Sequence, residues 1–199
     1  MNDYDKIFEI ASGNQGIFKT KMVVDAGIRK ERIRELLEKG EIKRIGHGFY
    51  IVAGTCRDDY FEIQERVPRS IFSYETAAYL WGMTTKCPEE FCCTVPRGYN
   101  TSKLKLNQKV KYHYVLQELY EIGCTNLISP QGNNLAIFDR ERTICDFIRH
   151  RNRIHPQVYS EVLNTYFKSE EKDIRKLAKY GKQFHVSQEI ALYIDVLYY

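Results

Sequence analysis

Apolar positions recur at helical spacing near the N-terminus. Those in residues 4–12 follow each other at i, i+3, i+4 and i+7, which predicts an amphipathic helix. Residues 20–26 and 29–39 fit two further helices, because glycines at positions 27 and 40 can end each of them. Thr20 is expected to cap the start of the second helix. The first forty residues are therefore predicted to contain three helices.

The sequence after the third helix has the pattern of two short strands around a turn with two glycines. It reads EIKRIGHGFYIV, with Ile42 and Arg44 before the turn and an apolar run, Phe49 to Val52, after it. A strand follows Gly48, whereas a phosphate-binding glycine loop leads into a helix, so the glycines are expected to form a turn. Three helices and a hairpin within the first 55 residues predict a winged helix-turn-helix.

The remaining sequence changes character twice. Residues 56–69 are polar and are predicted to link an N-terminal domain, residues 1–55, to a C-terminal domain, residues 70–199. The C-terminal domain is expected to open with a helix capped by Ser73, to be β-rich over 91–138 and to be helical over 139–199, with helices at 140–151, 156–168, 170–180 and 187–197. The expected fold class is α+β, with an N-terminal winged helix-turn-helix, a mixed domain with a β-rich middle, and a C-terminal helical bundle.

Composition places the chain among packed globular proteins, since 43% of its residues are hydrophobic and 13% aromatic. A net charge of +4 permits nucleic-acid binding, but only the distribution of the charges can argue for it. The sequence opens without an apolar signal segment and holds no apolar run of membrane-spanning length. We therefore expect a cytoplasmic, reduced protein without membrane contact, in which most of the six cysteines pack as small apolar groups: Cys56, Cys87, Cys92, Cys93, Cys124 and Cys145.

Basic residues concentrate on the third helix and at the hairpin, where they could release counterions from DNA phosphates. The outer face of this helix also carries Glu31, Glu35 and Glu38, so only its N-terminal end is expected to approach bases. Charge alone fits a solvated helix with i,i+4 pairs equally well, Glu35–Lys39 among them. The helix-turn-helix layout favours DNA. The predicted DNA-binding residues are Lys19, Thr20, Arg29, Lys30, Arg32, Arg34, Lys39, Lys43, Arg44 and His47.

Candidate catalytic and metal-binding patterns are weak. The cysteines in Cys87-x4-Cys92-Cys93 lack knuckle spacing, and His47 has no second ligand near it on the hairpin. The stretch DRERTICDFIRHR contains three acids, which are better explained as a helix cap, a residue favoured by the helix dipole and an ion-pair partner. We therefore expect no catalytic residue, no metal and no cofactor. The acids are Asp139, Glu141 and Asp146.

Three stretches carry a family resemblance. GIFKTKMVVDAGIRKERIRELLEKGEIKRIGHGFYIV resembles the N-terminal winged-helix domain of AbiEi-type antitoxins, from type IV (abortive-infection) toxin–antitoxin systems. SYETAAYLWGM is similar to the family's S-H-E-T-A-L-x-L-H-G-L segment, with Tyr74 and Trp81 where histidines are common. DRERTICDFIRHR is similar to the E-R-T-L-x-D segment that begins the family's C-terminal helices.

The resemblance implies a non-enzymatic protein with two roles in phage defence. Its winged helix would bind double-stranded DNA at inverted repeats in its own promoter, with self-association on the DNA, and repress the toxin–antitoxin operon. Its C-terminal domain would counter a nucleotidyltransferase-like toxin, and because type IV systems do not require a stable complex, direct binding is not assumed.

Two alternatives remain open from the sequence. One is a transcriptional regulator whose C-terminal domain senses a ligand or dimerises, with no toxin. The other is a metal-dependent nuclease in which the winged helix serves as a targeting module.

Overall fold

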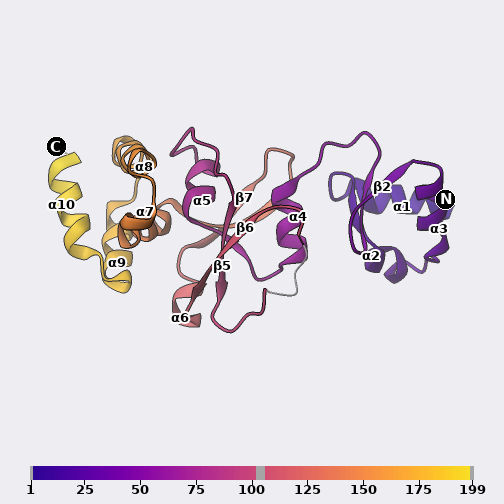
Figure 1. Ribbon diagram of the computed structural model, residues 1–199, viewed down its shortest axis with the longest axis horizontal. Coiled ribbons are helices and arrows are strands. Elements are labelled where there is room, and N and C mark those ends of the chain that lie inside the picture. The colour runs from indigo at the N-terminus through magenta and orange to yellow at the C-terminus, as the bar shows by residue number, and fades with distance from the viewer. Residues whose placement is uncertain (1, 102–105, 198–199) are drawn as a thin grey trace. The chain divides into compact units, whose positions relative to one another are not determined.

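The computed structural model describes residues 2–101 and 106–197. The fold is α+β, with helices and two separate β-sheets (Figure 1). The chain divides into two compact units. Unit 1 comprises Met1–Phe61 and the loop Ile128–Asn133, and unit 2 comprises Glu62–Leu127 and Asn134–Tyr199.

The described residues of unit 1 form three complete helices and a three-stranded antiparallel sheet with the strand order β1-β3-β2. Helix α1 begins with a capping box in which Asn2 and Asp5 exchange hydrogen bonds between side chains and backbone. The elements are α1 (Asp3–Ser12), β1 (Ile17–Lys19), α2 (Thr20–Asp25), α3 (Glu31–Glu38), β2 (Ile42–Gly46) and β3 (Phe49–Val52).

Apolar residues cover both faces of this small sheet. One face packs with the helices, because Phe18, Tyr50 and Ile42 share a cluster with the buried residues of α1 and α3. Phe18 and Tyr50 stack with ring centroids 5.4 Å apart, so the half-buried Tyr50 packs against the core. Ile17, Ile45, Ile51, Phe49 and Phe61 form a separate cluster. Since successive strand residues point to opposite faces, this second cluster covers the other side of the sheet.

The hairpin between β2 and β3 turns at His47 and Gly48. Gly48 has a φ of +71°, a left-handed conformation that glycine adopts without strain. The ladder shifts between Arg44 and Gly46, which pair with Tyr50 and Phe49, so Ile45 is an extra residue opposite the partner strand. This bulge re-aims the residues that lead into the turn.

The predicted linker, residues 56–69, contains helix α4 (Asp59–Arg66), and the division between the units falls within this helix. This helix was not predicted, because most of its residues are polar and the segment resembles a linker. The charged Glu62 is fully buried and pairs with Arg66 one turn later, at 3.1 Å between Oε1 and Nη1, and Ile63 is buried beside it. Asp58 is also buried and accepts a hydrogen bond from the backbone N–H of Phe61 in the first turn of α4.

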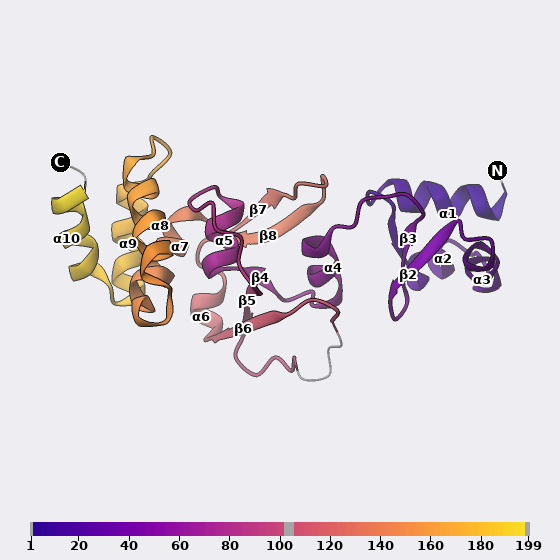
Figure 2. The same cartoon turned by 45° about the horizontal axis from the view of Figure 1, so that its top comes forward.

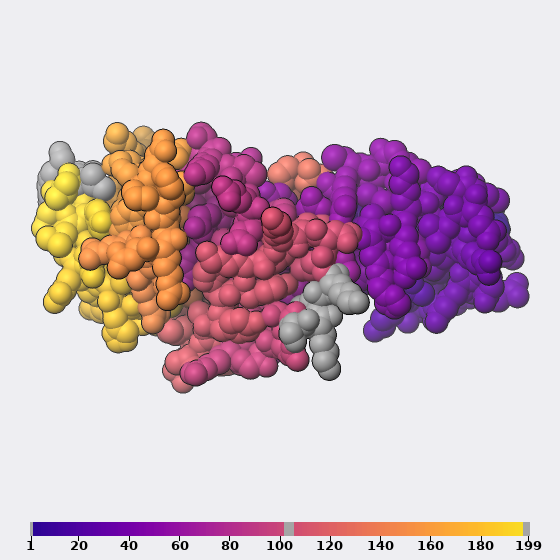
Figure 3. Space-filling model, in the orientation of Figure 1, coloured from indigo at the N-terminus to yellow at the C-terminus, as the bar shows by residue number. Residues whose placement is uncertain are grey.

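Unit 2 contains a mixed five-stranded sheet with the strand order β6-β5-β4-β8-β7. Strand β4 pairs antiparallel with β5 and parallel with β8, while β5 pairs parallel with β6. Strand β6 is therefore an edge strand, and its part of the chain lies at the surface in Figure 3. The elements up to the end of the sheet are β4 (Ile71–Phe72), α5 (Tyr74–Leu80), β5 (Phe91–Pro96), β6 (Val110–Val115), α6 (Gln117–Tyr120), β7 (Cys124–Ile128) and β8 (Asn134–Phe138).

In the described part of the chain, four α-helices follow the sheet, and Figure 2 shows them packed side by side. They contribute most of the larger apolar core, in which aromatic rings of α8 and α9 pack against α7. The helices are α7 (Arg140–Arg149), α8 (Pro156–Lys168), α9 (Ile174–Phe184) and α10 (Ser187–Leu197), with a 3-10 turn at Arg151–Arg153.

The start of α9 and the cap of α2 differ from their predictions, and two short strands were missed. Helix α9 begins four residues later than expected, because the side chain of Asp173 caps it by accepting from the backbone N–H of Lys176. Lys19, not Thr20, occupies the cap position of α2, since Thr20 is already helical. The strands β1 and β4 were not predicted, because three and two residues are too short for a period-two pattern.

Candidate nucleic-acid interface

The hairpin turn and the start of α2 lie together in unit 1. The backbone N–H of Thr20 donates to the carbonyl oxygen of Gly48 at 2.9 Å, which joins the first residue of α2 to the turn. Lys19, the last residue of β1, pairs with Phe49 in the ladder and places its Nζ 5.4 Å from the centre of that ring. Two distant stretches of predicted DNA-binding residues are thus brought to one place.

Arg44 organises the turn itself. Its Nε donates to the carbonyl oxygen of Gly46 at 3.1 Å, and its Nη2 lies 3.2 Å from Nδ1 of His47. The guanidinium therefore packs on the turn residues, with its side chain still exposed. Such a fixed, exposed guanidinium can bind an anion with little further loss of side-chain freedom.

Lys43 and Arg44 face opposite sides of the sheet, although they are neighbours. Arg44 pairs with Tyr50, which belongs to the cluster on the helix side. Lys43 pairs with Ile51, which belongs to the cluster on the other side. Side chains alternate along a strand, so Arg44 shares the side of the helices and Lys43 does not.

The exposed face of α3 has mixed charge. Arg34 is 82% exposed and pairs with Glu38, at 3.0 Å between Nε and Oε1. Arg29 and Lys30 precede the helix, are exposed, and form no ion pair with any residue that the structure describes. The basic groups that are not neutralised by a neighbour therefore lie at the N-terminal end of α3, where Glu31 is the nearest acid in sequence.

Arg32 and Lys39 lie against α1 instead. Both contact the ring of Tyr4, with Arg32 Cζ 5.5 Å and Lys39 Nζ 4.8 Å from its centre. Arg32 donates from Nη1 to both carboxylate oxygens of Glu35, and the Tyr4 hydroxyl also hydrogen-bonds to Glu35. These bonds, first from Tyr4 and then from Arg32, lower the pKa of Glu35.

This cluster differs from the expected i,i+4 pair of Glu35 with Lys39. Glu35 pairs with Arg32, because Tyr4 of the neighbouring helix supplies a hydroxyl that completes the network. Arg32 and Lys39 are two of the ten predicted contact residues. In the structure, their side chains pack between α1 and α3.

Lys21 was not among the predicted DNA-binding residues, although it is basic and exposed like most of them. It lies in the first turn of α2, beside Thr20, and is exposed. None of the described residues forms an ion pair with it. The run Lys19-Thr20-Lys21 was the signal, since the helix start was already predicted there.

The three acids of unit 2 are held within α7 and its surroundings. Asp139 caps the helix by accepting from the backbone N–H of Arg142. Glu141 accepts from the Tyr166 hydroxyl at 3.1 Å. Asp146 lies 3.1 Å from Nε of Arg142, and burial raises the pKa of this aspartate while the arginine opposes the change. All three carboxylates therefore have partners that stabilise the fold.

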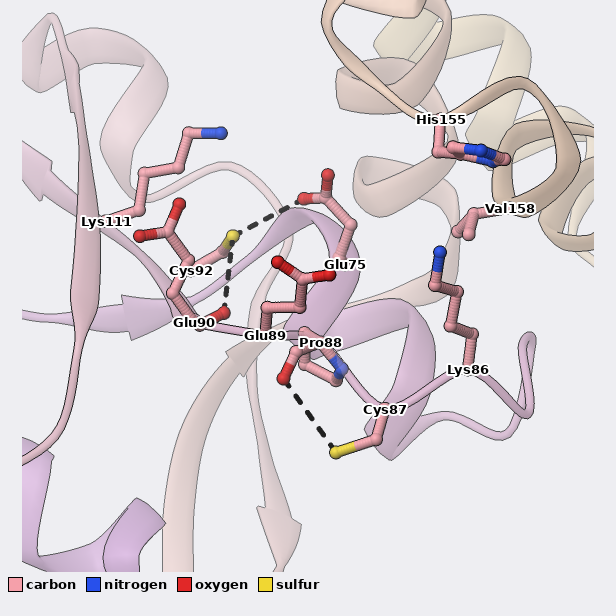
Figure 4. Close-up of a pocket in the computed structure, with 10 residues that line it drawn as sticks. All are labelled: Glu75, Lys86, Cys87, Pro88, Glu89, Glu90, Cys92, Lys111, His155 and Val158. Atoms are coloured by element: carbon pink, nitrogen blue, oxygen red, sulfur yellow. Dashed lines mark hydrogen bonds between the residues drawn. The ribbon is translucent and has the colours of Figure 1, made fainter.

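Cys87 and Cys92 line one pocket of about 240 Å³, together with three glutamates, two lysines and His155 (Figure 4). Their sulfurs point to different partners, Cys87 to the carbonyl oxygen of Pro88 and Cys92 to Oε2 of Glu75 at 3.4 Å. Burial raises the pKa of the Cys92 thiol to about 12, so it stays protonated. All six cysteines are unbridged. Within the described ranges, no three His, Cys, Asp or Glu side chains converge as metal ligands.

The N-terminal region has a match among known families. Residues 5–53 match the family described as transcriptional regulator, AbiEi antitoxin. This segment runs from the first turn of α1 to the end of β3 and holds all ten predicted contact residues. The resemblance to AbiEi antitoxins is thereby confirmed for it.

The fold as a whole resembles that of a protein of known structure. The crystal structure of the RV2827C protein from Mycobacterium tuberculosis aligns with a TM-score of 0.64 at 13% identity, over 94% of this chain and 74% of that one. At this identity the likeness concerns the fold. No functionally curated protein shows significant sequence similarity to the chain. None of the described helices has the length and apolar character needed to cross a membrane.

Proposed function

We propose that the protein is a sequence-specific DNA-binding antitoxin that represses its own operon. The observation that carries the proposal is the gathering of exposed basic groups around the β2–β3 turn and the helix starts, inside the segment that matches AbiEi transcriptional regulators. Double-stranded DNA with inverted repeats is the proposed ligand, since a protein that self-associates on DNA reads two related half-sites.

We assign α2 and α3 as the helix-turn-helix and the β2–β3 hairpin as its wing. Helix α3 enters the major groove with its N-terminal end, where Arg29 and Lys30 are unopposed. The wing then meets the sugar–phosphate backbone with Arg44, which faces the same side of the sheet as the helices. Arg32 and Lys39 hold α3 on α1 and position it.

Unit 2 is proposed to counter a nucleotidyltransferase-like toxin in the cytoplasm, without catalysing a reaction itself. The partnered carboxylates of α7 support a structural role for the acids that a nuclease would need. A stable complex with the toxin is not part of the proposal.

The test is binding of the intact protein to a fragment of its own promoter, followed by mobility shift at several salt concentrations. Affinity should fall steeply as salt rises, because each phosphate contact releases counterions. Replacing Arg34, Lys43 and Arg44 by alanine should weaken binding without unfolding the protein, since all three are exposed. If this triple variant binds as well as the parent, the assignment of the β2–β3 hairpin and its Arg44 to the DNA contact surface is wrong.

A matched control comes from helix α9, whose Arg175, Lys179 and Lys182 are also exposed. Replacing these three by alanine removes the same charge from the other unit. The proposal predicts parental binding for this control. An equal loss in both variants would mean that net charge, and not the interface, governs binding.

A further inference from the structure

Unit 2 contains a second pocket, of about 440 Å³, between the edge strand β6 and the end of α7. We call it the Arg149 pocket. It is larger than the pocket around Cys87 and Cys92, and its volume suits a small organic molecule rather than a single ion. Its lining residues are Tyr74, Tyr112, His113, Tyr114, Val115, Leu116, Leu119, Arg149, His150 and Arg153.

The charges of this pocket are of one sign. Arg149 and Arg153 line it, are exposed, and form no ion pair with another residue in the described part of the chain. The lining contains no carboxylate. The pocket in Figure 4 differs, because Glu75, Glu89 and Glu90 line it along with two lysines and offset their charge.

The imidazoles in the Arg149 pocket are held neutral and close to an aromatic ring. His113 stacks on Tyr74 with ring centroids 3.8 Å apart, and Nδ1 of His150 lies 3.1 Å from the Tyr74 hydroxyl. Burial lowers the pKa of His113 to about 4, so it is neutral at physiological pH. Its Nε2 is buried and hydrogen-bonds to nothing among the residues described. Buried polar atoms in proteins are nearly always hydrogen-bonded, and a bound ligand would supply the missing partner.

Tyr74 adds a second anomaly at the same place. Its φ is +49°, a left-handed conformation that costs a bulky residue on the order of 1–2 kcal/mol. Strained residues of this kind cluster at ligand sites, where the surrounding structure holds them in place. At this position the Tyr74 ring stacks on His113 and meets the His150 ring edge-on, with ring centroids 5.4 Å apart.

We propose that the Arg149 pocket binds a small phosphorylated organic ligand of nucleoside-monophosphate size. Two guanidinium groups without acidic partners match a dianionic phosphate, whose oxygens each guanidinium can contact in bidentate fashion. The tyrosine rings and the apolar side chains of Val115, Leu116 and Leu119 contact the organic part. A monocarboxylate would leave one of the two positive charges uncompensated.

The experiment is calorimetric titration of the full-length protein with three probes: a nucleoside monophosphate, the same nucleoside without phosphate, and inorganic phosphate. The nucleotide should bind more tightly than either fragment. If the nucleoside binds as tightly as the nucleotide, the phosphate assignment is overturned. If inorganic phosphate binds as tightly as the nucleotide, the proposed contacts with the organic part of the ligand are overturned. If no nucleoside monophosphate binds at millimolar concentration, the proposal fails.

Variants locate the site. Arg149→Gln and Arg153→Gln should each weaken nucleotide binding roughly tenfold or more, as expected for loss of a charge-assisted hydrogen bond. Arg151→Gln is the matched control, because Arg151 lies in the same 3-10 turn as Arg153 and is exposed but does not line this pocket. Equal weakening by all three would overturn the assignment, since binding would then follow surface charge. This test is independent of the DNA experiment on unit 1.

Discussion

Two arginines, one in each unit of this protein, differ in burial and in the number of their partners. Arg34 of unit 1 is 82% exposed and has one carboxylate beside it. Arg142 of unit 2 is fully buried, pairs with Asp146, and donates to the carbonyl oxygens of Leu119 and Ile122. Its guanidinium also lies about 4 Å from the ring centre of Phe184. The same side chain therefore serves as surface charge in one unit and as a core residue in the other.

Burial decides whether the charge of an arginine can act on a binding partner. A buried arginine such as Arg142 stabilises one arrangement of its own unit and is inaccessible to DNA. An exposed arginine contributes little to stability and is available to a ligand. Four predictions test this contrast, in order of expected effect.

The largest effect is expected from Arg142→Met. The substitution leaves Asp146 buried without its cation, and breaking a buried pair costs about 3–5 kcal/mol. Denaturant unfolding at neutral pH measures the loss. Arg34→Ala, which breaks an exposed pair, should cost less than about 1 kcal/mol. Similar losses in both variants would refute the contrast.

The second effect is pH-dependent and belongs to unit 2. The pKa of His113 is lowered to about 4, chiefly by burial and then by Lys111, His150 and Arg153. The His113 imidazole therefore binds a proton near pH 6.5 in the unfolded chain, but only near pH 4 in the folded chain. Because the unfolded state binds more protons in this range, the free energy of unfolding should fall as pH drops from 6.5 towards 4. The loss should reach about 3 kcal/mol at most.

His113→Gln is the matched variant for this prediction. It removes the titrating group, so the fall in stability over that pH range should become shallower. Burial also lowers the pKa of His150, so part of the slope should remain. An unchanged slope would show that His113 is not the group responsible.

The third prediction compares a glycine from each unit. Gly123 and Gly40 both have left-handed backbone, with φ of +78° and +72°. A Cβ on Gly123 would lie 2.5 Å from the Cβ of Arg142, whereas one on Gly40 meets nothing within 4 Å. Gly123→Ala should therefore destabilise by at least about 1 kcal/mol more than Gly40→Ala, as thermal or denaturant unfolding will show. Equal costs would mean that backbone conformation alone decides.

The smallest effect concerns DNA affinity within unit 1. Arg44→Ala should weaken promoter binding by a few-fold, about 1 kcal/mol, and reduce the salt slope by about one. Lys43→Ala should do less, because Lys43 faces the other side of the sheet. Arg32→Ala should lower stability, since it removes the packing on Tyr4. A larger effect of Lys43 than of Arg44 would reverse the proposed orientation of the wing.

Local signals in the sequence predicted most of the helices and the hairpin. The helix α8 has the predicted bounds, and Asp139 caps α7 as expected, because caps and apolar spacing act within a few residues. Helix α4 could not be predicted in this way. Its buried Glu62 is made tolerable by Arg66 and by Gln108, and the second of these partners lies far away in the sequence.

Distance along the chain also limited the prediction of sites. The basic residues of unit 1 lie within a short stretch, so the sequence could predict that they gather. Two of them, Arg32 and Lys39, could not be separated from the rest, because their contact with Tyr4 depends on how α1 and α3 pack. The Arg149 pocket was missed for the same reason, since Tyr74, His113 and Arg149 come from three separate elements.

The loop Ile128–Asn133 has a topological consequence. It belongs to unit 1, where the buried Asp58 accepts hydrogen bonds from the side chains of Ser129 and Asn133, but both its ends continue into unit 2. The backbone therefore crosses the boundary between the units three times, and no single proteolytic cut can release unit 1 whole. A fragment that stops after Phe61 would leave the Asp58 carboxylate without two of its donors. A circular permutant opened inside this loop would instead report how much each unit depends on it.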